Sequence, residues 1–381
     1  MSYLEYRVRS VPTGFSKLLY LNWALVFLIT AVAVMSCVML YSVGGSFSKW
    51  ADPQLKRFIA TFSLMFIMAM IPIWFWRNMS FLAYGATLFL IILVSIMGST
   101  GMGAQRWIDL GFIKLQPSEL AKLGIVMALA AYYDMLPEHN VSRPLWVALP
   151  LILTALPVIL VLRQPDLGTA ILIMLGGGSV MFLAGVHWAY FATVIATGTV
   201  AVLAVFQSRD TSWQLLKDYQ YKRIDTFLDP SSDPLGAGYH ITQSKIALGS
   251  GGVSGRGLTQ GTQSQLNFLP EKHTDFIFTT LAEELGFVGG ISLLGIYVLI
   301  LVFCLISAIE AKDKYSYLLI SGIAMTFFLF FAVNMSMVMG LIPVVGVPLP
   351  LISWGGSAML VLMAGFGLIQ SAYVHRPRAK K

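Results

Sequence analysis

The chain has 381 residues, of which 57% are hydrophobic and only 11% charged, with a net charge of +7 at neutral pH. Soluble domains carry about 25% charged residues, so this composition excludes a soluble globular protein. The basic excess is scattered through loops and termini, which is typical of membrane topology and excludes the single basic patch of a nucleic-acid-binding protein.

Apolar runs predict about ten transmembrane helices, since a helix needs about 20 apolar residues to cross the bilayer. In chain order the predicted spans are Leu19–Tyr41, Phe58–Phe75, Phe81–Met97, Glu119–Tyr133, Pro144–Leu162, Leu167–Val186, Trp188–Phe206, Phe276–Ala308, Tyr315–Leu341 and Leu351–Val374. The first run is too long for the core of a signal peptide, so we expect it to be a retained span. The pattern predicts an all-α, polytopic integral membrane protein that forms a single domain over residues 1–381.

Lysine and arginine residues in short loops indicate the orientation of the spans. The more basic side carries Arg7, Arg9, Lys17, Arg77, Arg143, Lys312, Lys314, Arg376, Arg378, Lys380 and Lys381, and the opposite side carries Lys49, Lys56, Arg57, Arg106, Lys114 and Arg163. Because cytoplasmic loops hold the excess of basic residues, we expect both termini to be cytoplasmic. An even number of spans requires that the termini share a side.

The polar segment of residues 207–274 separates the seventh and eighth predicted spans. At on the order of 70 residues it is far longer than an ordinary connection, and loops of that length are usually functional or disordered. Spaced aromatic residues, among them Tyr219, Tyr239 and Phe268, and glycine-rich turns indicate order. We therefore expect a large, structured extracytoplasmic loop on the outer face of the membrane.

A shorter polar segment, between the third and fourth spans, carries the first candidate site residues. A turn of small residues leads to Arg106 and Trp107, and Pro117 marks the start of the next helix. Glu119 and Lys122 are three residues apart, so they share one face of that helix. They form either an intramembrane ion pair that fixes helix packing or the polar wall of a substrate cavity.

Two further segments place charged groups near the ends of spans. Asp166 could cap the helix that follows it or, with Arg163, line the same outward cavity. The glycine run of residues 249–257, with Lys245 and Arg256 beside it, could be a flexible loop or could cradle an anion with its backbone N–H groups. This run lacks the Gly-Lys-Ser/Thr sequence of a P-loop.

The long loop returns to the membrane through His273, Thr274 and Asp275. Thr274 or Asp275 could be the N-cap of the next helix. Alternatively, partial desolvation raises the pKa of a carboxylate and makes Asp275 a general base, with His273 as a group that could tune it. Glu283 and Glu284 lie two turns deeper on adjacent helix faces, so they cannot point the same way.

The segment from Pro343 to Ser357, just before the last span, is broken by prolines and glycines and includes Ser353. Backbone that is not helical at membrane depth must be buried in protein or must line a water-filled cavity. Together with the acidic and basic segments above, it indicates a polar site inside an apolar bundle.

Taken together, these segments resemble the SEDS family (shape, elongation, division and sporulation). The matching motifs are collinear and run from the third span to the last. They are Ala104-Gln105-Arg106-Trp107-Ile108, Gln116-Pro117-Ser118-Glu119, Gln164-Pro165-Asp166-Leu167-Gly168, Pro270-Glu271-Lys272-His273-Thr274-Asp275-Phe276-Ile277-Phe278, Glu283-Glu284-Leu285-Gly286 and the Pro343–Ser357 segment. Over its whole length the chain is more similar to the elongation branch, RodA, than to the division branch, FtsW.

The resemblance implies a peptidoglycan glycosyltransferase of the bacterial cytoplasmic (inner) membrane that polymerises lipid II at its outer face during cell elongation. It also implies two kinds of partner: a class B penicillin-binding protein, which is the cross-linking transpeptidase, and the membrane proteins of the elongation complex. No nucleic acid is expected to bind. We expect no tightly bound cofactor, although a divalent cation, Mg²⁺ or Mn²⁺, could assist the diphosphate of the substrate.

Family membership would place the catalytic aspartate at Asp275, which agrees with the interpretation of that residue as a base. The reaction also needs cations that hold the departing diphosphate. The candidate substrate-binding residues are Arg106, Trp107, Glu119, Lys122, Arg163, Asp166, Lys245, Arg256, His273, Ser353 and Ser357.

Two other classes of function stay open from the residues alone. A flippase for lipid-linked precursors would use the same cavity without bond chemistry. An ion-coupled transporter would place its carboxylates near the membrane midplane, often in repeated halves. The key acid here lies at the outer edge and no repeat is visible, so transport fits less well.

Overall fold

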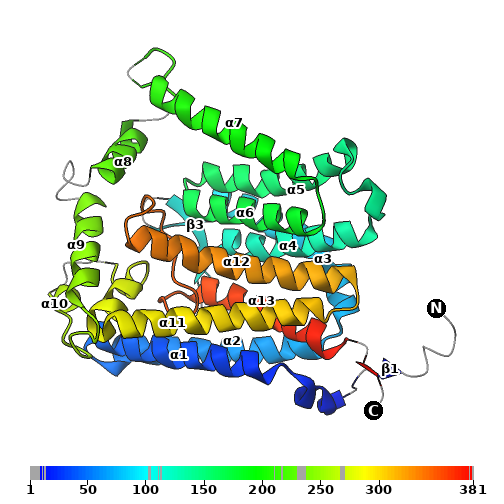
Figure 1. The fold of residues 1–381 in the computed structure, drawn as a ribbon, viewed down its shortest axis with the longest axis horizontal. Helices are drawn as coiled ribbons and strands as arrows, with labels where there is room; N and C mark the ends of the chain where they lie inside the picture. Colours follow the sequence, from blue (N-terminus) through cyan, green and yellow to red (C-terminus); the bar gives the residue numbers. More distant parts are fainter. Residues whose placement is uncertain are drawn as a thin grey trace.

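The computed structural model describes the chain except for residues 1–8, 11, 13, 102–103, 110, 112–113, 210, 216–217, 230–236, 267–270, 377 and 380–381. Its main body is a bundle of long helices (Figure 1). These are α1 (Trp23–Gly44), α2 (Asp52–Met70), α3 (Ile73–Met97), α4 (Pro117–Met135), α5 (Pro144–Arg163), α6 (Leu167–Leu183), α7 (Trp188–Gln207), α11 (Ile277–Ile309), α12 (Lys314–Val338) and α13 (Gly356–Val374). The protein is thus an all-α, multi-pass membrane protein, and each predicted span corresponds to one of these helices. Seven of them are long and apolar enough to cross a bilayer by length and composition.

Four predicted boundaries were clearly wrong because polar residues lie near the start of a helix or prolines interrupt an apolar run. The third span was predicted to start at Phe81, but α3 begins at Ile73. The second span was predicted to start at Phe58, but α2 begins at Asp52, with a proline in its first turn. Pro72 then separates α2 from α3, so the predicted end at Phe75 crosses a turn. The last span was predicted from Leu351, whereas α13 begins only at Gly356.

Both ends of the described chain lie at the same end of the bundle. The short strand β1 (Arg9–Ser10) pairs antiparallel with β5 (Arg378–Ala379), as Figure 1 also indicates. This arrangement confirms the prediction that the termini share a side.

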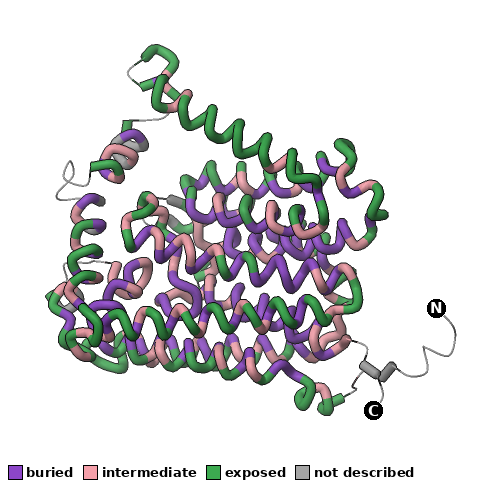
Figure 2. The backbone as a smooth tube through the Cα atoms, in the orientation of Figure 1, coloured by how far each residue is buried: buried purple, intermediate pink, exposed green. Residues whose placement is uncertain are grey.

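The most buried helices are α4, α12 and α13, while α7 lies at the edge (Figure 2). Helix α12 packs against α4, α6, α11 and α13. Aromatic rings fill this contact: Tyr297 of α11 stacks on Phe331 of α12 with ring centroids 5.1 Å apart. No residue of α7 is buried, and the helix diverges from the bundle toward the long loop.

The polar segment after α3 folds as a small antiparallel sheet. Its strands are β2 (Ser99–Gly101), β3 (Ala104–Asp109) and β4 (Lys114–Leu115), in the order β2-β3-β4. The sheet leads directly into α4, so it places Arg106 and Trp107 close to the beginning of that helix.

The long loop is structured in its described parts, as predicted, and contains α8 (Asp218–Leu228), α9 (Ala237–Ser250) and α10 (Thr262–Gln265). Helix α8 is held to the end of α7, because Arg209 donates two hydrogen bonds, of 2.7 and 2.8 Å, to the Asp225 carboxylate. Helix α9 is held to α12, because the Ser244 hydroxyl donates to the Val338 carbonyl at 2.8 Å. The loop therefore rests on two different parts of the bundle.

The glycine run of the loop is docked into a break in α11. Gly286 interrupts this helix with φ 69° and ψ −164°. Two loop N–H groups then donate to the freed helix carbonyls, and two helix N–H groups donate back to loop carbonyls. The pairs are Arg256 N to Glu283 O at 3.0 Å, Gly257 N to Glu284 O at 3.0 Å, Phe287 N to Gly252 O at 2.9 Å and Val288 N to Val253 O at 3.1 Å. The run is therefore docked against α11 and is not a free loop, and the N–H groups of Arg256 and Gly257 are engaged within the protein.

The two buried glutamates behind the break point in different directions, as their adjacent positions predicted. Glu284 accepts a hydrogen bond of 2.6 Å from the Ser42 hydroxyl on α1. Glu283 accepts from the backbone N–H of Gln263 at 2.9 Å and from the Thr262 hydroxyl at 3.1 Å. These side chains fasten both α1 and the loop to the first half of α11.

We expect Gly255→Ala to destabilise the protein more than Gly252→Ala. Both glycines have positive φ (79° and 53°), but a Cβ at Gly255 would lie 2.1 Å from the Glu284 carbonyl oxygen, whereas Gly252 has open space. The difference in stability between the two variants isolates the steric clash from backbone strain, and overpacking of this kind costs about 1–3 kcal/mol. Thermal unfolding in detergent measures this difference as a difference in melting temperature. Equal melting temperatures for the two variants would contradict the docking of the glycine run.

Candidate active site

Asp275 lies in the turn of residues 271–276 that immediately precedes α11. The turn is closed by Glu271, whose carboxylate accepts a hydrogen bond of 2.7 Å from the Thr274 hydroxyl and whose carbonyl accepts one of 3.2 Å from the Phe276 N–H. The N-cap position of α11 is Phe276, and it has no side-chain cap. Neither the Thr274 nor the Asp275 side chain therefore caps the helix.

The Asp275 carboxylate is partly buried and faces other acids. Within the described chain no group donates a hydrogen bond to it, and its Oδ2 lies 3.6 Å from where a Cβ would stand on Gly346. Burial, and to a lesser extent the neighbouring carboxylates Glu271 and Asp166, together raise the pKa of Asp275 from 3.8 to about 6. Such a carboxylate is a better proton acceptor than an ordinary aspartate.

Asp166 caps α6 and also belongs to the same acidic cluster. Its carboxylate accepts from the Thr169 N–H at 3.2 Å and from the Gln116 amide at 2.9 Å. The guanidinium of Arg106 lies 4.0 Å away. The helix-cap interpretation and the cavity interpretation of Asp166 are thus compatible, because one oxygen caps while the other faces Gln116.

Arg106 fastens the small sheet to the junction between α5 and α6. Its Nε donates to the Gln164 carbonyl at 2.8 Å and its Nη2 to the Pro165 carbonyl at 2.6 Å. The remaining Nη1 points toward Asp166. The guanidinium therefore stands beside the acidic cluster, with two of its three nitrogens bonded to backbone.

Glu119 and Lys122 form the predicted ion pair. The Lys122 Nζ lies 2.5 Å from the Glu119 Oε1, and the two side chains are only 2% and 5% exposed. The ammonium also lies over the ring of Phe330, 4.0 Å from its centroid. Within the described residues the second Glu119 oxygen has no hydrogen-bond partner, so Lys122 alone compensates this buried charge.

Five other predicted site residues make their contacts away from Asp275. Trp107 is half-buried in β3, and Ser357 is buried in the first turn of α13. Arg163 is exposed at the end of α5, and Lys245 is exposed on α9 beside Gly340. The Arg256 side chain donates to the Thr262 hydroxyl at 2.8 Å. Within the described chain, no hydrogen bond or ion pair links these five residues to Asp275.

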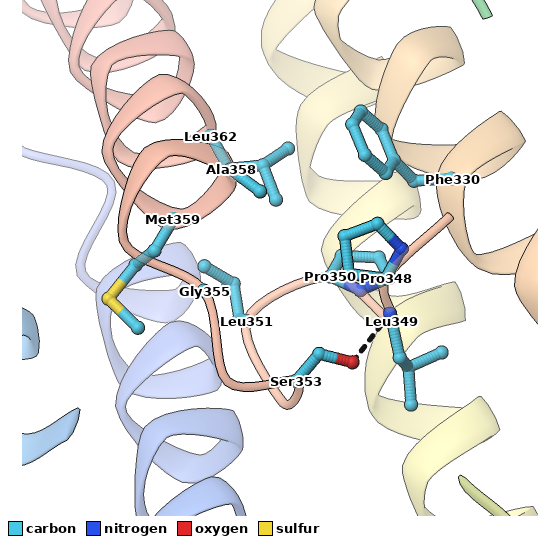
Figure 3. A pocket seen from close by; sticks show the side chains of 10 residues that line it. All are labelled: Phe330, Pro348, Leu349, Pro350, Leu351, Ser353, Gly355, Ala358, Met359 and Leu362. Carbon is cyan, nitrogen blue, oxygen red and sulfur yellow. Dashed lines mark hydrogen bonds between the residues drawn. The ribbon is translucent and has the colours of Figure 1, made fainter. Parts of the chain in front are cut away.

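The broken segment of residues 341–355 packs directly against the turn that carries Asp275. The Ser353 hydroxyl donates to the Thr274 carbonyl at 2.6 Å. It accepts from the Leu349 N–H at 2.7 Å, the bond drawn in Figure 3. A small cavity lies beside it and is lined by residues of α12, the broken segment and α13, namely Phe330, Pro348, Leu349, Pro350, Leu351, Ser353, Gly355, Ala358, Met359 and Leu362. Ser353 was predicted to bind substrate, and its one hydroxyl hydrogen is engaged with the turn that carries Asp275.

His273 belongs to an aromatic stack that sequence reasoning missed. Its ring stacks on Trp50, with centroids 4.4 Å apart, and Trp50 meets Trp354 edge-on at 4.9 Å. The Arg57 guanidinium lies over the Trp354 ring at 3.8 Å. Burial lowers the pKa of His273. Trp50 and Arg57 are isolated in the sequence, so no motif could have pointed to them.

The described residues include no group of three or more histidine, cysteine, aspartate or glutamate side chains arranged to hold a metal ion. The first residue of the acidic motif, Pro270, lies outside the described residues.

Comparison with known proteins matches residues 16–378 to the family model of the FtsW, RodA and SpoVE proteins, described as "Cell cycle protein". The peptidoglycan glycosyltransferase MrdB of Escherichia coli K12 is 40% identical over 366 residues, covering 95% of this chain and 96% of that protein. The probable peptidoglycan glycosyltransferase FtsW of Buchnera aphidicola is 36% identical, covering 82% of this chain and 87% of that protein.

Solved structures of related proteins are similar to this chain over nearly its whole length. A chain from a peptidoglycan synthase complex, studied for the coordination of polymerisation and crosslinking, has a TM-score of 0.80 and 32% identity, covering 93% of this chain and 97% of that one. The crystal structure of the rod shape determining protein RodA of Thermus thermophilus has a TM-score of 0.70 and 29% identity, with 93% and 97% covered.

Proposed function

The chain belongs to the family of FtsW, RodA and SpoVE cell cycle proteins and is a peptidoglycan glycosyltransferase, and we propose that it polymerises lipid II with Asp275 as the general base. The observation that carries this proposal is the Asp275 carboxylate, which is free of hydrogen-bond donors in the described chain and has its pKa raised to about 6. RodA-like elongation synthesis is the branch favoured by the greater identity to MrdB than to FtsW.

The chemistry needs one base and one group of cations. The 4-hydroxyl of the acceptor sugar attacks the anomeric carbon of the donor, whose bond to the polyprenyl diphosphate breaks with inversion. Asp275 takes the hydroxyl proton during this attack. The departing diphosphate carries the negative charge, and Arg106, whose guanidinium lies 4.0 Å from the Asp166 carboxylate, is a cation that could receive it. Lys122, Arg163, Lys245 and Arg256 are further candidate cations, and Mg²⁺ or Mn²⁺ carried by the diphosphate is compatible with this scheme.

The test is polymerisation of labelled lipid II by the purified protein in nanodiscs, with glycan products resolved by length. A flippase would move lipid II across the bilayer without forming glycan, so the two functions give different products in the same sample. Labelled lipid II that stays monomeric in the presence of folded protein would overturn the proposal.

A class B penicillin-binding protein is the proposed partner, because the solved relative is a chain of a complex that coordinates polymerisation with crosslinking. Other membrane proteins of an elongation complex are proposed on the same ground. Co-purification after expression with a class B penicillin-binding protein, and any change in polymerisation rate, tests this assignment.

We place the protein in the bacterial cytoplasmic membrane, with both termini in the cytoplasm and the long loop outside. The support is the excess of lysine and arginine at the end of the bundle that holds both termini. Cysteines on described loop residues such as Val253 or Leu266, both exposed, should react with an impermeant reagent in cells with a permeabilised outer membrane. Labelling only after lysis would reverse the topology.

The rate of polymerisation should depend on pH through Asp275. A base works deprotonated, so kcat/KM should be constant above the pKa of about 6 and should fall as the pH drops below it. Glu271→Gln removes a neighbouring charge that raises this pKa, so the acid limb should move to lower pH. A limb centred near the ordinary value of 3.8 in both proteins would contradict the environment described for Asp275.

A further inference from the structure

Asn334 joins the two irregular backbone segments that meet at the candidate active site. The residue is completely buried (0% exposed) in α12. Its amide nitrogen donates one hydrogen bond of 2.8 Å to the Asp275 carbonyl and one of 2.7 Å to the Val347 carbonyl. Both hydrogens of one side-chain amide are therefore used, each on a different segment.

Neither acceptor lies within a helix. Asp275 is in the turn before α11, and Val347 is in the segment between α12 and α13. Carbonyls of non-helical backbone in a membrane protein need donors from the protein, since lipid supplies none. An asparagine offers two hydrogens from a single short side chain, which no hydroxyl or aliphatic residue of similar size provides.

The same bonds determine where the Asp275 carboxylate lies. Its Oδ2 faces Gly346, 3.6 Å from the place of a Cβ there, and Gly346 is adjacent to Val347, the second residue that Asn334 holds. The amide thus links the backbone that carries the carboxylate to the backbone that the carboxylate faces. Displacement of either one changes the position of the base relative to its surroundings.

A purely structural role leaves one feature unexplained. Within the described residues, the Asn334 Oδ1 is buried and has no hydrogen-bond partner. An unpaired buried acceptor is unfavourable, so this amide is not the best choice for stability alone. The function of this amide therefore lies in its two donated hydrogen bonds, to the Asp275 and Val347 carbonyls.

We propose that Asn334 is a positioning residue for the glycosyl transfer reaction, acting through the main chain of Asp275. The inference rests on the proposed function, in which Asp275 is the base. Ser353 supports the same turn one residue earlier, through its bond to the Thr274 carbonyl. Asn334 differs because its two bonds connect the turn to the wall that the carboxylate faces.

The experiment compares Asn334→Leu with Thr326→Val in the full-length protein, using lipid II polymerisation in nanodiscs and thermal unfolding. Thr326 is a buried polar residue of the same helix whose hydroxyl bonds only to its own helix, at Gly322. Asn334→Leu should lower kcat by about 10²-fold with little change in KM, because small displacements of a catalytic group cost that much. Thr326→Val should keep the kcat of the unmodified protein.

A double-mutant cycle with Asp275→Asn separates positioning from general damage. If Asn334 acts through the base, Asn334→Leu should cost little more in the Asp275→Asn background than Asp275→Asn costs alone. An equal loss in both backgrounds, or an equal loss of kcat in Thr326→Val, would overturn the inference. If Asn334→Leu does not fold, Asn334→Ser, which keeps one donor, replaces it in the experiment. It should likewise lower kcat with little change in KM, and an unchanged kcat would overturn the inference.

The outcomes also separate this inference from the function on which it rests. An unmodified protein that makes no glycan from lipid II would remove the proposed function itself. Glycan synthesis by the unmodified protein together with an unchanged kcat in a folded Asn334→Leu protein would remove only the positioning role.

Discussion

Asp275→Asn should fold, reach the membrane and bind its partner, yet make almost no glycan from lipid II. General-base catalysis contributes about 10²–10⁴-fold, and the amide cannot accept the proton. The substitution should leave stability unchanged for two reasons. The side chain does not cap α11, and the bond from Asn334 goes to the Asp275 carbonyl, which the variant retains.

The matched control is Asp313→Asn. Asp313 caps α12 by accepting from the Ser316 N–H at 2.8 Å, and asparagine caps about as well as aspartate. The control should therefore keep both its melting temperature and its rate. Near-normal polymerisation by a folded Asp275→Asn protein would remove the assignment of the base and leave Glu271 as the next acid to test.

The second large effect is expected from Lys122→Ala. Removing the ammonium leaves Glu119 as an unpaired charge in the protein interior, which costs about 3–5 kcal/mol. The exposed pair between Lys56 and Asp52 supplies the comparison, since its nitrogen and oxygen are 2.7 Å apart but the Lys56 side chain is 73% exposed. Lys56→Ala should cost only about 0.3–0.5 kcal/mol. Equal melting temperatures for the two alanine variants would contradict the burial of the Glu119 pair.

A double variant separates folding from substrate contact. Glu119→Gln combined with Lys122→Met removes both charges at similar volume, and such neutral replacements of a buried pair are often tolerated. The double variant should therefore recover the melting temperature. Its KM and kcat for lipid II then test the role of Lys122 in binding. Normal values in a protein of normal stability would contradict the assignment of Lys122 to the substrate cavity.

Hydropathy was a sufficient guide to the spans because a lipid-facing segment must satisfy its own backbone, which makes each long apolar run a helix. It failed at Asp52, where charged residues begin a helix at the membrane edge, and at Leu351, where an apolar run is not helical. At Leu351 a neighbouring segment, and not the composition, determines the local structure. Ser353 and the backbone of the turn at Asp275 are one such pair of neighbours.

The candidate site likewise has features that the sequence indicates and features that only tertiary contacts decide. The sequence alone indicated the ion pair of Glu119 with Lys122 and the helix cap at Asp166 among the alternatives, because each depends on residues close together in the chain. Only the tertiary structure decided that the glycine run docks at a break in α11 and that Asn334 donates a hydrogen bond to the turn at Asp275. Those contacts join segments distant in sequence through backbone carbonyls and N–H groups, which every residue carries, so no side-chain pattern marks them in advance.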